Sequence, residues 1–111
     1  MHGGALIMRF IASADFTPDR PWDALNLATI SPATVRLHWT DSEYVWHRND
    51  GTEVFVVVAG EVDMHYRDGR GDEHVRRLTP GLICVAEIGD EHKAVPIGAA
   101  SIVVVEQEGS I

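Results

Sequence analysis

Three residues that can do chemistry lie close together in the stretch WHRNDGTEVFVVVAGEV, residues 46–62. His47 and Asn49 are two positions apart, and Glu53 follows across the turn dipeptide Asp50-Gly51. In an extended chain, side chains two positions apart point to the same face, so His47 and Asn49 share one. A His and a Glu at the start of a buried strand cost free energy unless a partner satisfies them. That partner is a metal ion, a bound small molecule, or the other residue of the pair.

The spacing of this stretch resembles the first motif of the cupin family. The chain reads His47-x-Asn49-x3-Glu53-x6-Gly60. The cupin motif reads His-x-His, then three or four residues, then Glu, six residues and Gly. The likeness is complete except at Asn49, where the family most often has a second His.

A second stretch, residues 81–92, resembles the second cupin motif. The chain reads Gly81-x5-Glu87-x-Gly89-x2-His92, and the family reads Gly, five residues, Pro-x-Gly, two residues, His. Two motifs in this order, with a short stretch between them, make the resemblance specific, and it covers about residues 30–105. The residues alone allow His92 to meet the first motif but do not require it.

The resemblance implies an all-β double-stranded β-helix, the jelly-roll barrel of the cupin type, with a divalent metal inside. Carried over by position, the ligands are His47, Asn49, Glu53 and His92, and the metal is Fe, Mn, Zn or Ni. An amide oxygen is a poorer partner than imidazole for zinc, nickel or copper. Two His and one carboxylate still suit non-haem iron or manganese and leave positions open for substrate. Glu87 replaces the motif proline, which loosens the turn before His92.

The sequence therefore favours a small-molecule-binding protein with a partly degenerate metal site, and it leaves open whether that site serves an enzyme. A metal-free site is the alternative. Burial would then raise the pKa of Glu53 unless a protonated His or hydrogen bonds compensate. A Glu paired with a His in an apolar cavity is able to act as a general base, so Glu53 is the candidate catalytic residue of an acid–base isomerase. In the simplest alternative, the cluster binds a ligand without catalysis, as in a sensor or binding module.

Other reactive side chains carry less weight. His38 shares a strand face with Arg36, which favours a surface or pairing role over a place in the cavity. His74 lies beside the hairpin turn at Asp68-Gly69 and is expected to be exposed. Cys84 is flanked by apolar residues, which predicts a buried packing thiol.

Short strands must position these residues. The alternation of apolar residues and the Gly-bearing turns predict nine strands, at 25–30, 34–40, 44–48, 53–59, 61–67, 74–78, 82–86, 92–96 and 101–107. No long helix is expected. Residues 1–23 read as an irregular N-terminal arm with Trp22 as an anchor, and residues 24–111 as the barrel domain. Met8 is an alternative start to Met1.

Composition limits the partners. A chain of 111 residues with 45% apolar content fits one folded domain. The net charge of −8 and nine scattered Lys and Arg argue against nucleic acid and anionic membranes. The longest apolar run, residues 54–59, is far below the ~20 residues that span a bilayer. One cysteine excludes an intramolecular disulfide and favours the cytoplasm. Exposed edge strands favour a homodimer.

Overall fold

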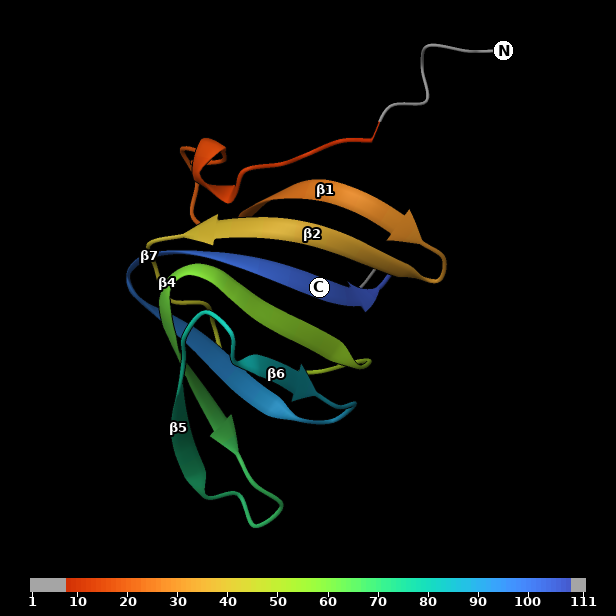
Figure 1. Ribbon diagram of the computed structural model, residues 1–111. Helices are drawn as coiled ribbons and strands as arrows, with labels where there is room; N and C mark the ends of the chain where they lie inside the picture. Colours follow the sequence, from red (N-terminus) through yellow and green to blue (C-terminus); the bar gives the residue numbers. More distant parts are fainter. Residues whose placement is uncertain (1–7, 109–111) are drawn as a thin grey trace.

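The computed structural model describes residues 8–108, which form seven β-strands and one short 3-10 helix (Figure 1). The elements are η1 (Ser13–Asp15), β1 (Asp23–Ile30), β2 (Ala33–Thr40), β3 (His47–Arg48), β4 (Glu53–Arg67), β5 (Glu73–Leu78), β6 (Ile83–Ala86) and β7 (Glu91–Gln107). The predicted all-β class is confirmed. Residues 1–7, on which the alternative starts differ, lie outside the described part. No helix within residues 8–108 has the length and apolar character that crossing a membrane requires.

The two long strands, β4 and β7, build the barrel because each runs through both of its sheets. The first half of β4 pairs with the second half of β7, beginning with Glu53 opposite Glu106. The second half of β4 pairs with the first half of β7, as far as Tyr66 opposite His92. Strands β2, β1 and β6 extend the first pair, and β3 and β5 extend the second. All pairs are antiparallel, and the result is a jelly roll (Figure 1).

Both long strands bend at a glycine where they pass from one sheet to the other. Gly60 in β4 and Gly98 in β7 have positive φ angles of 74° and 70°, which residues with a side chain rarely adopt. The register of β4 against β7 shifts twice between residues 57 and 61, as at a β-bulge. A Cβ atom at Gly60 would overlap the carbonyl oxygen of Ala99. Only glycine can both adopt this φ angle without strain and leave room for the Ala99 carbonyl at position 60.

These bends explain why the structure has seven strands and not the nine that were predicted. Glycine usually interrupts a strand, so the sequence predicts strand ends at Gly60 and in the region of Gly98. In the structure, segments 53–59 and 61–67 are one strand, β4, and segments 92–96 and 101–107 are one strand, β7. Of the predicted strand 44–48, only His47 and Arg48 form a ladder with a neighbour, and the N–H of Tyr44 donates a single hydrogen bond to the carbonyl of Ala94.

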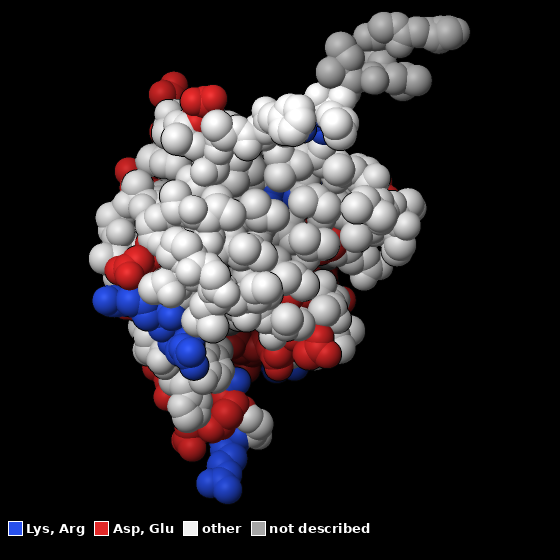
Figure 2. Space-filling model, in the orientation of Figure 1, with Lys and Arg blue, Asp and Glu red and all other residues white. Residues whose placement is uncertain are grey.

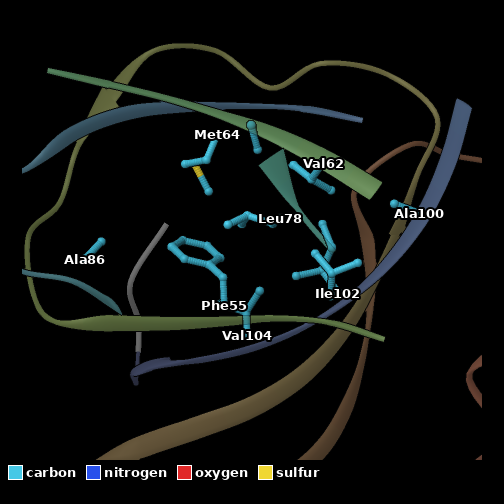
Figure 3. Packing of buried hydrophobic residues seen from close by; sticks show 10 residues of the cluster. Phe55, Val62, Met64, Leu78, Ala86, Ala100, Ile102 and Val104 are labelled. Atoms are coloured by element: carbon cyan, nitrogen blue, oxygen red, sulfur yellow. The ribbon is translucent and has the colours of Figure 1, made fainter. Parts of the chain in front are cut away.

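The apolar core fills the space between the two sheets. Figure 3 shows Phe55, Met64 and Leu78 pointing toward one another at its centre. Its buried members are Phe55, Val57, Val62, Met64, Leu78, Ala86, Ala94, Ala100, Ile102 and Val104. Each large aliphatic or aromatic side chain buried in this way stabilises the fold by roughly 1.5–3 kcal/mol. The core therefore holds β4 and β7, the strands that also carry Glu53 and His92.

The segment before β1 lies against the first sheet. The Arg9 guanidinium donates a hydrogen bond to the carbonyl of Leu27, and Ile11 borders a shallow cavity shared with Leu37. Trp22 packs against the core, and its Nε1–H donates to the carbonyl of Ser42 at 2.7 Å. In the view of Figure 2, charged side chains are few on the surface over β1 and β2 and gather around the β4–β5 hairpin.

Candidate metal centre

Strand pairing brings the histidines of the two motifs together. Strand β3 has only two residues, but it pairs with the start of β7 and sets His47 directly opposite His92. Their imidazole rings meet edge to face, with centroids 4.2 Å apart. The meeting that the sequence left open is thus made by a single short ladder between the two motifs.

Backbone hydrogen bonds lock the turns of the two motifs to each other. The N–H of Asn49 donates to the carbonyl of Asp90 at 2.8 Å, and the N–H of Gly89 donates to the carbonyl of Asn49 at 2.9 Å. Gly89 has a φ angle of 90°, which accounts for glycine at this motif position. The Asp90 carboxylate accepts the N–H of Glu87 at 2.8 Å. This bond restrains the turn at the position where the motif proline is missing.

Glu53 enters the same volume from the first residue of β4. The ligand atoms of His47, Glu53 and His92 all lie within 4.8 Å of one another. Nε2 of His92 lies 3.7 Å from Oε1 of Glu53 and donates to Oδ1 of Asn49 at 2.6 Å. Asn49, Glu53 and His92 are buried, and His47 is half-buried. All four predicted residues therefore share one cluster at one end of the barrel.

The two imidazoles are held differently. Nδ1 of His47 donates to the carbonyl of Val45 at 3.3 Å, which leaves Nε2 free as a ligand atom. Phe55 packs against the ring of His92 with centroids 5.4 Å apart. Nδ1 of His92 and Nδ2 of Asn49 are buried, and neither has a hydrogen-bond partner among residues 8–108. Buried polar atoms without partners are rare in folded proteins, and two of them in one cluster indicate a functional site.

Glu53 is ionised at neutral pH. Burial opposes its ionisation, but hydrogen bonds with His92 and Glu106 and the nearby His47 outweigh burial. The pKa of Glu53 is therefore below its usual value. The partners that a metal-free site needs to keep this carboxylate charged are present.

Glu106 is a further residue of this cluster, and sequence reasoning missed it. It lies opposite Glu53 in the β4–β7 ladder and is buried. Burial and contact with Glu53 raise the pKa of Glu106 to about 8, so it holds a proton at neutral pH. The alternation of SIVVVEQ places Ile102, Val104 and Glu106 on one strand face. That alternation was the available signal, but no motif spacing connects Glu106 to Glu53.

The other reactive side chains lie outside the cluster. His38 is half-buried, its Nδ1 lies 3.1 Å from the carbonyl oxygen of Trp22, and burial lowers its pKa. His38 thus has the pairing role that the sequence favoured over a place in the cavity. His74 is exposed and bonds to Asp68 at 2.8 Å. Cys84 is half-buried, and burial raises the pKa of its thiol, which lowers its reactivity.

A cavity of about 570 Å³ opens beside the cluster. His92 and Phe55 form part of its wall, together with Met64, Leu78 and Leu82. Tyr44 meets His47 edge-on, with ring centroids 5.4 Å apart. A volume of this size, with an apolar wall and a few convergent polar groups, is typical of a small-molecule site.

The donor set fits a divalent cation. It offers two imidazole nitrogens, one carboxylate oxygen and one amide oxygen, with the first three ligand atoms within 4.8 Å of one another. Glu53 brings the negative charge that such an ion needs, and the orphaned atoms of His92 and Asn49 lie beside it. Two His and one carboxylate with open positions are the set that non-haem iron prefers.

No family model and no curated protein matches the chain, whereas solved structures match it clearly. A cupin-2 domain containing protein from Shewanella frigidimarina is 26% identical, with a TM-score of 0.73, over 86% of this chain and 87% of that one. A cupin superfamily protein from Desulfitobacterium hafniense is 14% identical, with a TM-score of 0.70, over 90% and 91% of the two chains.

In a larger protein, the same fold makes up only one part of the chain. Hydroquinone 1,2-dioxygenase PnpCD in complex with Fe3+ is 17% identical, with a TM-score of 0.72, over 81% of this chain but only 29% of that one. The chain therefore has the fold of a small cupin domain, as the two motifs predicted.

Proposed function

We propose that the chain is a small-molecule-binding protein that holds iron(II) or manganese(II) with His47, Glu53 and His92, and with Asn49 as a weak fourth ligand. The convergence of the three ligand atoms within 4.8 Å carries this proposal. An amide oxygen in place of imidazole favours these metals over zinc and nickel, which remain outcomes of the test. The iron complex of the dioxygenase that shares the fold supports the same choice.

The protein residues have separate tasks at such a site. The bound metal would supply Lewis acidity and open positions for a substrate atom. Glu53 keeps a negative charge in the cluster because its partners lower its pKa. Phe55 covers one side of His92 and keeps water from it. The apolar wall of the cavity binds the body of the ligand and holds it beside the cluster.

Elemental analysis tests the metal, on untagged protein purified without chelator and without a nickel column. About one equivalent of a single metal is expected, and none in His92→Ala or Glu53→Gln. His74→Ala, a change of the exposed hairpin histidine, is the matched control and retains the metal. Asn49→His restores the usual motif residue and tightens binding by a large factor. Absence of metal in both the wild type and Asn49→His, after incubation with iron, manganese, zinc and nickel, contradicts the proposal.

A second candidate function is acid–base isomerisation of a keto acid or sugar without metal. The ionised Glu53 beside the protonated Glu106 favours it, because two carboxyl groups with pKa values driven apart are a suitable base and acid. Deuterium uptake from heavy water into such compounds, followed by NMR, tests it. Uptake that survives chelation but is lost in Glu53→Gln supports this function, and uptake lost on chelation contradicts it. Binding without any turnover would identify a sensor.

We also propose a cytoplasmic homodimer. Ile83 and Val85 are 61% and 58% exposed on β6, and Val58 is 39% exposed on β4. These exposed apolar side chains lie on two neighbouring strands and form an apolar area of the kind that commonly marks an interface. Light scattering should give twice the mass of the 111-residue chain, and Val85→Asp should shift it toward the monomer. A monomeric wild type contradicts the dimer.

A further inference from the structure

The cavity wall combines an apolar interior with a charged mouth. The interior is formed by Phe55, Met64, Leu78, Leu82, Cys84 and Ala86. The charged residues of its lining are Arg67, Asp68, Arg76, Asp90 and Glu91. A cavity of this kind takes a ligand with an apolar body and a polar end. Whether the polar end of the ligand is anionic or cationic depends on which charged side chains at the mouth lack a partner in the protein.

The carboxylates at the mouth already have partners. Glu91 accepts from Arg67 at 3.2 Å. Asp68 lies 2.8 Å from Nε2 of His74 and also accepts two backbone N–H groups of its own hairpin. Asp90 accepts the backbone N–H of Glu87 at 2.8 Å. Each of these carboxylates thus already interacts with a donor of the protein, which reduces its attraction for a cationic ligand.

The arginines of the β4–β5 hairpin are not equivalent. Arg67 pairs with Glu91 and covers the ring of Trp46 at 4.0 Å. Arg77 pairs with Asp63 through two hydrogen bonds of 2.9 and 3.1 Å. Among residues 8–108, Arg76 has no ion pair and no side-chain hydrogen bond. Of these three side chains, Arg76 alone has its full donor capacity available.

The strand register directs Arg76 toward the cavity. Arg76 is opposite Met64 in the β4–β5 ladder, and directly opposite residues share a face of the sheet. Arg76 is also two positions from Leu78, so the two lie on the same side of β5. Met64 and Leu78 are both buried in the core. Arg77, between them in sequence, belongs to the other face, where it meets Asp63.

We propose that the ligand of this cavity is a small apolar carboxylate whose anionic group is bound by Arg76. A guanidinium has a planar set of donors that matches a carboxylate in a bidentate way. Arg76 is exposed and belongs to the lining of the cavity, so its guanidinium is accessible to a ligand there. The apolar body lies against Met64 and Leu78, in the cavity that His92 also borders. The inference deepens the proposed function and rests on its small-molecule part, not on the metal.

Benzoate and its neutral analogue benzamide are suitable probes, because they differ in charge and little in shape. Each is titrated into the protein as purified, and again after chelation, and binding is followed by backbone amide NMR shifts. Benzoate is expected to bind the wild type roughly tenfold more tightly than benzamide, with or without the metal. Arg76→Gln abolishes this preference. Arg77→Gln, the neighbouring arginine on the opposite face, retains it and is the matched control.

Three outcomes overturn the inference. The first is a preference for benzoate that survives in Arg76→Gln. The second is a preference that disappears on chelation, because the metal would then bind the carboxylate. The third is no binding of either probe to the wild type. Failure of the metal proposal gives a different result, since protein without metal would still distinguish benzoate from benzamide through Arg76.

Discussion

The barrel interior has a polar end and an apolar end, and the same two long strands build both. We define the polar end by the buried residues Asn49, Glu53, His92 and Glu106. We define the apolar end by the buried residues Val57, Val62, Ala100 and Ile102. On β4, Glu53 and Val57 are four positions apart on one face, and opposite them on β7 stand Glu106 and Ile102. Three residue pairs of the same ladder lie between this pair of carboxyl groups and this pair of aliphatic side chains.

The difference between the two ends shows how a small domain can contain a reactive site and stay folded. At the apolar end, burial of aliphatic surface stabilises the fold. At the polar end, two carboxyl groups face each other, and Nδ1 of His92 has no partner among the described residues. A buried polar atom without a partner, such as this nitrogen, lowers stability by about 1–3 kcal/mol. The apolar end must offset this cost, and the shared strands transmit its rigidity to the motif residues.

The largest expected effect is on stability, and it separates the two ends. Ile102→Ala removes a side chain that is 2% exposed and should lower the free energy of unfolding by about 2–5 kcal/mol. The folded fraction of this variant should retain its metal. Glu53→Gln should do the reverse, with metal lost and a far smaller change in stability. Denaturant unfolding and elemental analysis of both variants provide the comparison, and equal loss of stability would remove the distinction.

The sequence predicted much of the polar end because its residues belong to spaced motifs. His47, Asn49 and Glu53 lie within one short stretch, so local geometry alone placed them together. His92 was connected to them only through resemblance to a family, because strand pairing between distant segments leaves no local signal. The short β3–β7 ladder that joins them has just two rungs. No periodicity could have revealed it.

The features that the sequence missed depend on long-range pairing. The sequence predicts the end of a strand at Gly60, because a positive φ angle is common in turns and is seldom expected inside a strand. Glu106 stood in a predicted strand, but its meeting with Glu53 depends on the register between two distant strands. The unpaired state of Arg76 could not be predicted either. It depends on the folded arrangement, in which Arg67 pairs with Glu91 of β7 and Arg77 pairs with Asp63 of β4.

The next expected effect is a dependence of stability on pH that arises at the polar end. Burial raises the pKa of Glu106 from 4.5 to about 8 in the fold. Between these values the folded state holds a proton that the unfolded state releases, so stability falls as pH rises through this interval. Protonation of Glu53 changes the stability only at lower pH, because the pKa of Glu53 is lowered in the folded state. The measurement is the free energy of unfolding of chelated protein from pH 5 to 8.

Glu106→Gln is the variant that isolates this effect. Its amide cannot titrate, so the decline in stability with pH should be smaller than in the wild type. His38 works in the opposite direction, since burial lowers its pKa and its contribution rises with pH up to 6.5. It is the same in both proteins and cancels in the difference. Parallel pH profiles would mean that Glu106 is ionised in the fold, and the polar end would then lack its proton donor.

The smallest expected effect compares two threonines on β2. Thr34 lies opposite Glu106 and is 5% exposed, and its hydroxyl has no hydrogen-bond partner among residues 8–108. Thr40 is fully buried, and its hydroxyl donates to the carbonyl of Ser42 at 2.8 Å and accepts the N–H of Ser42 at 3.1 Å. Thr34→Val removes an unsatisfied group and should raise the free energy of unfolding by up to about 1 kcal/mol. Thr40→Val leaves Ser42 without its partners and should lower it by about 1–2 kcal/mol. A loss of stability in Thr34→Val would instead mean that its hydroxyl bonds to Glu106 in solution. The polar end would then be a satisfied network and not a destabilising one.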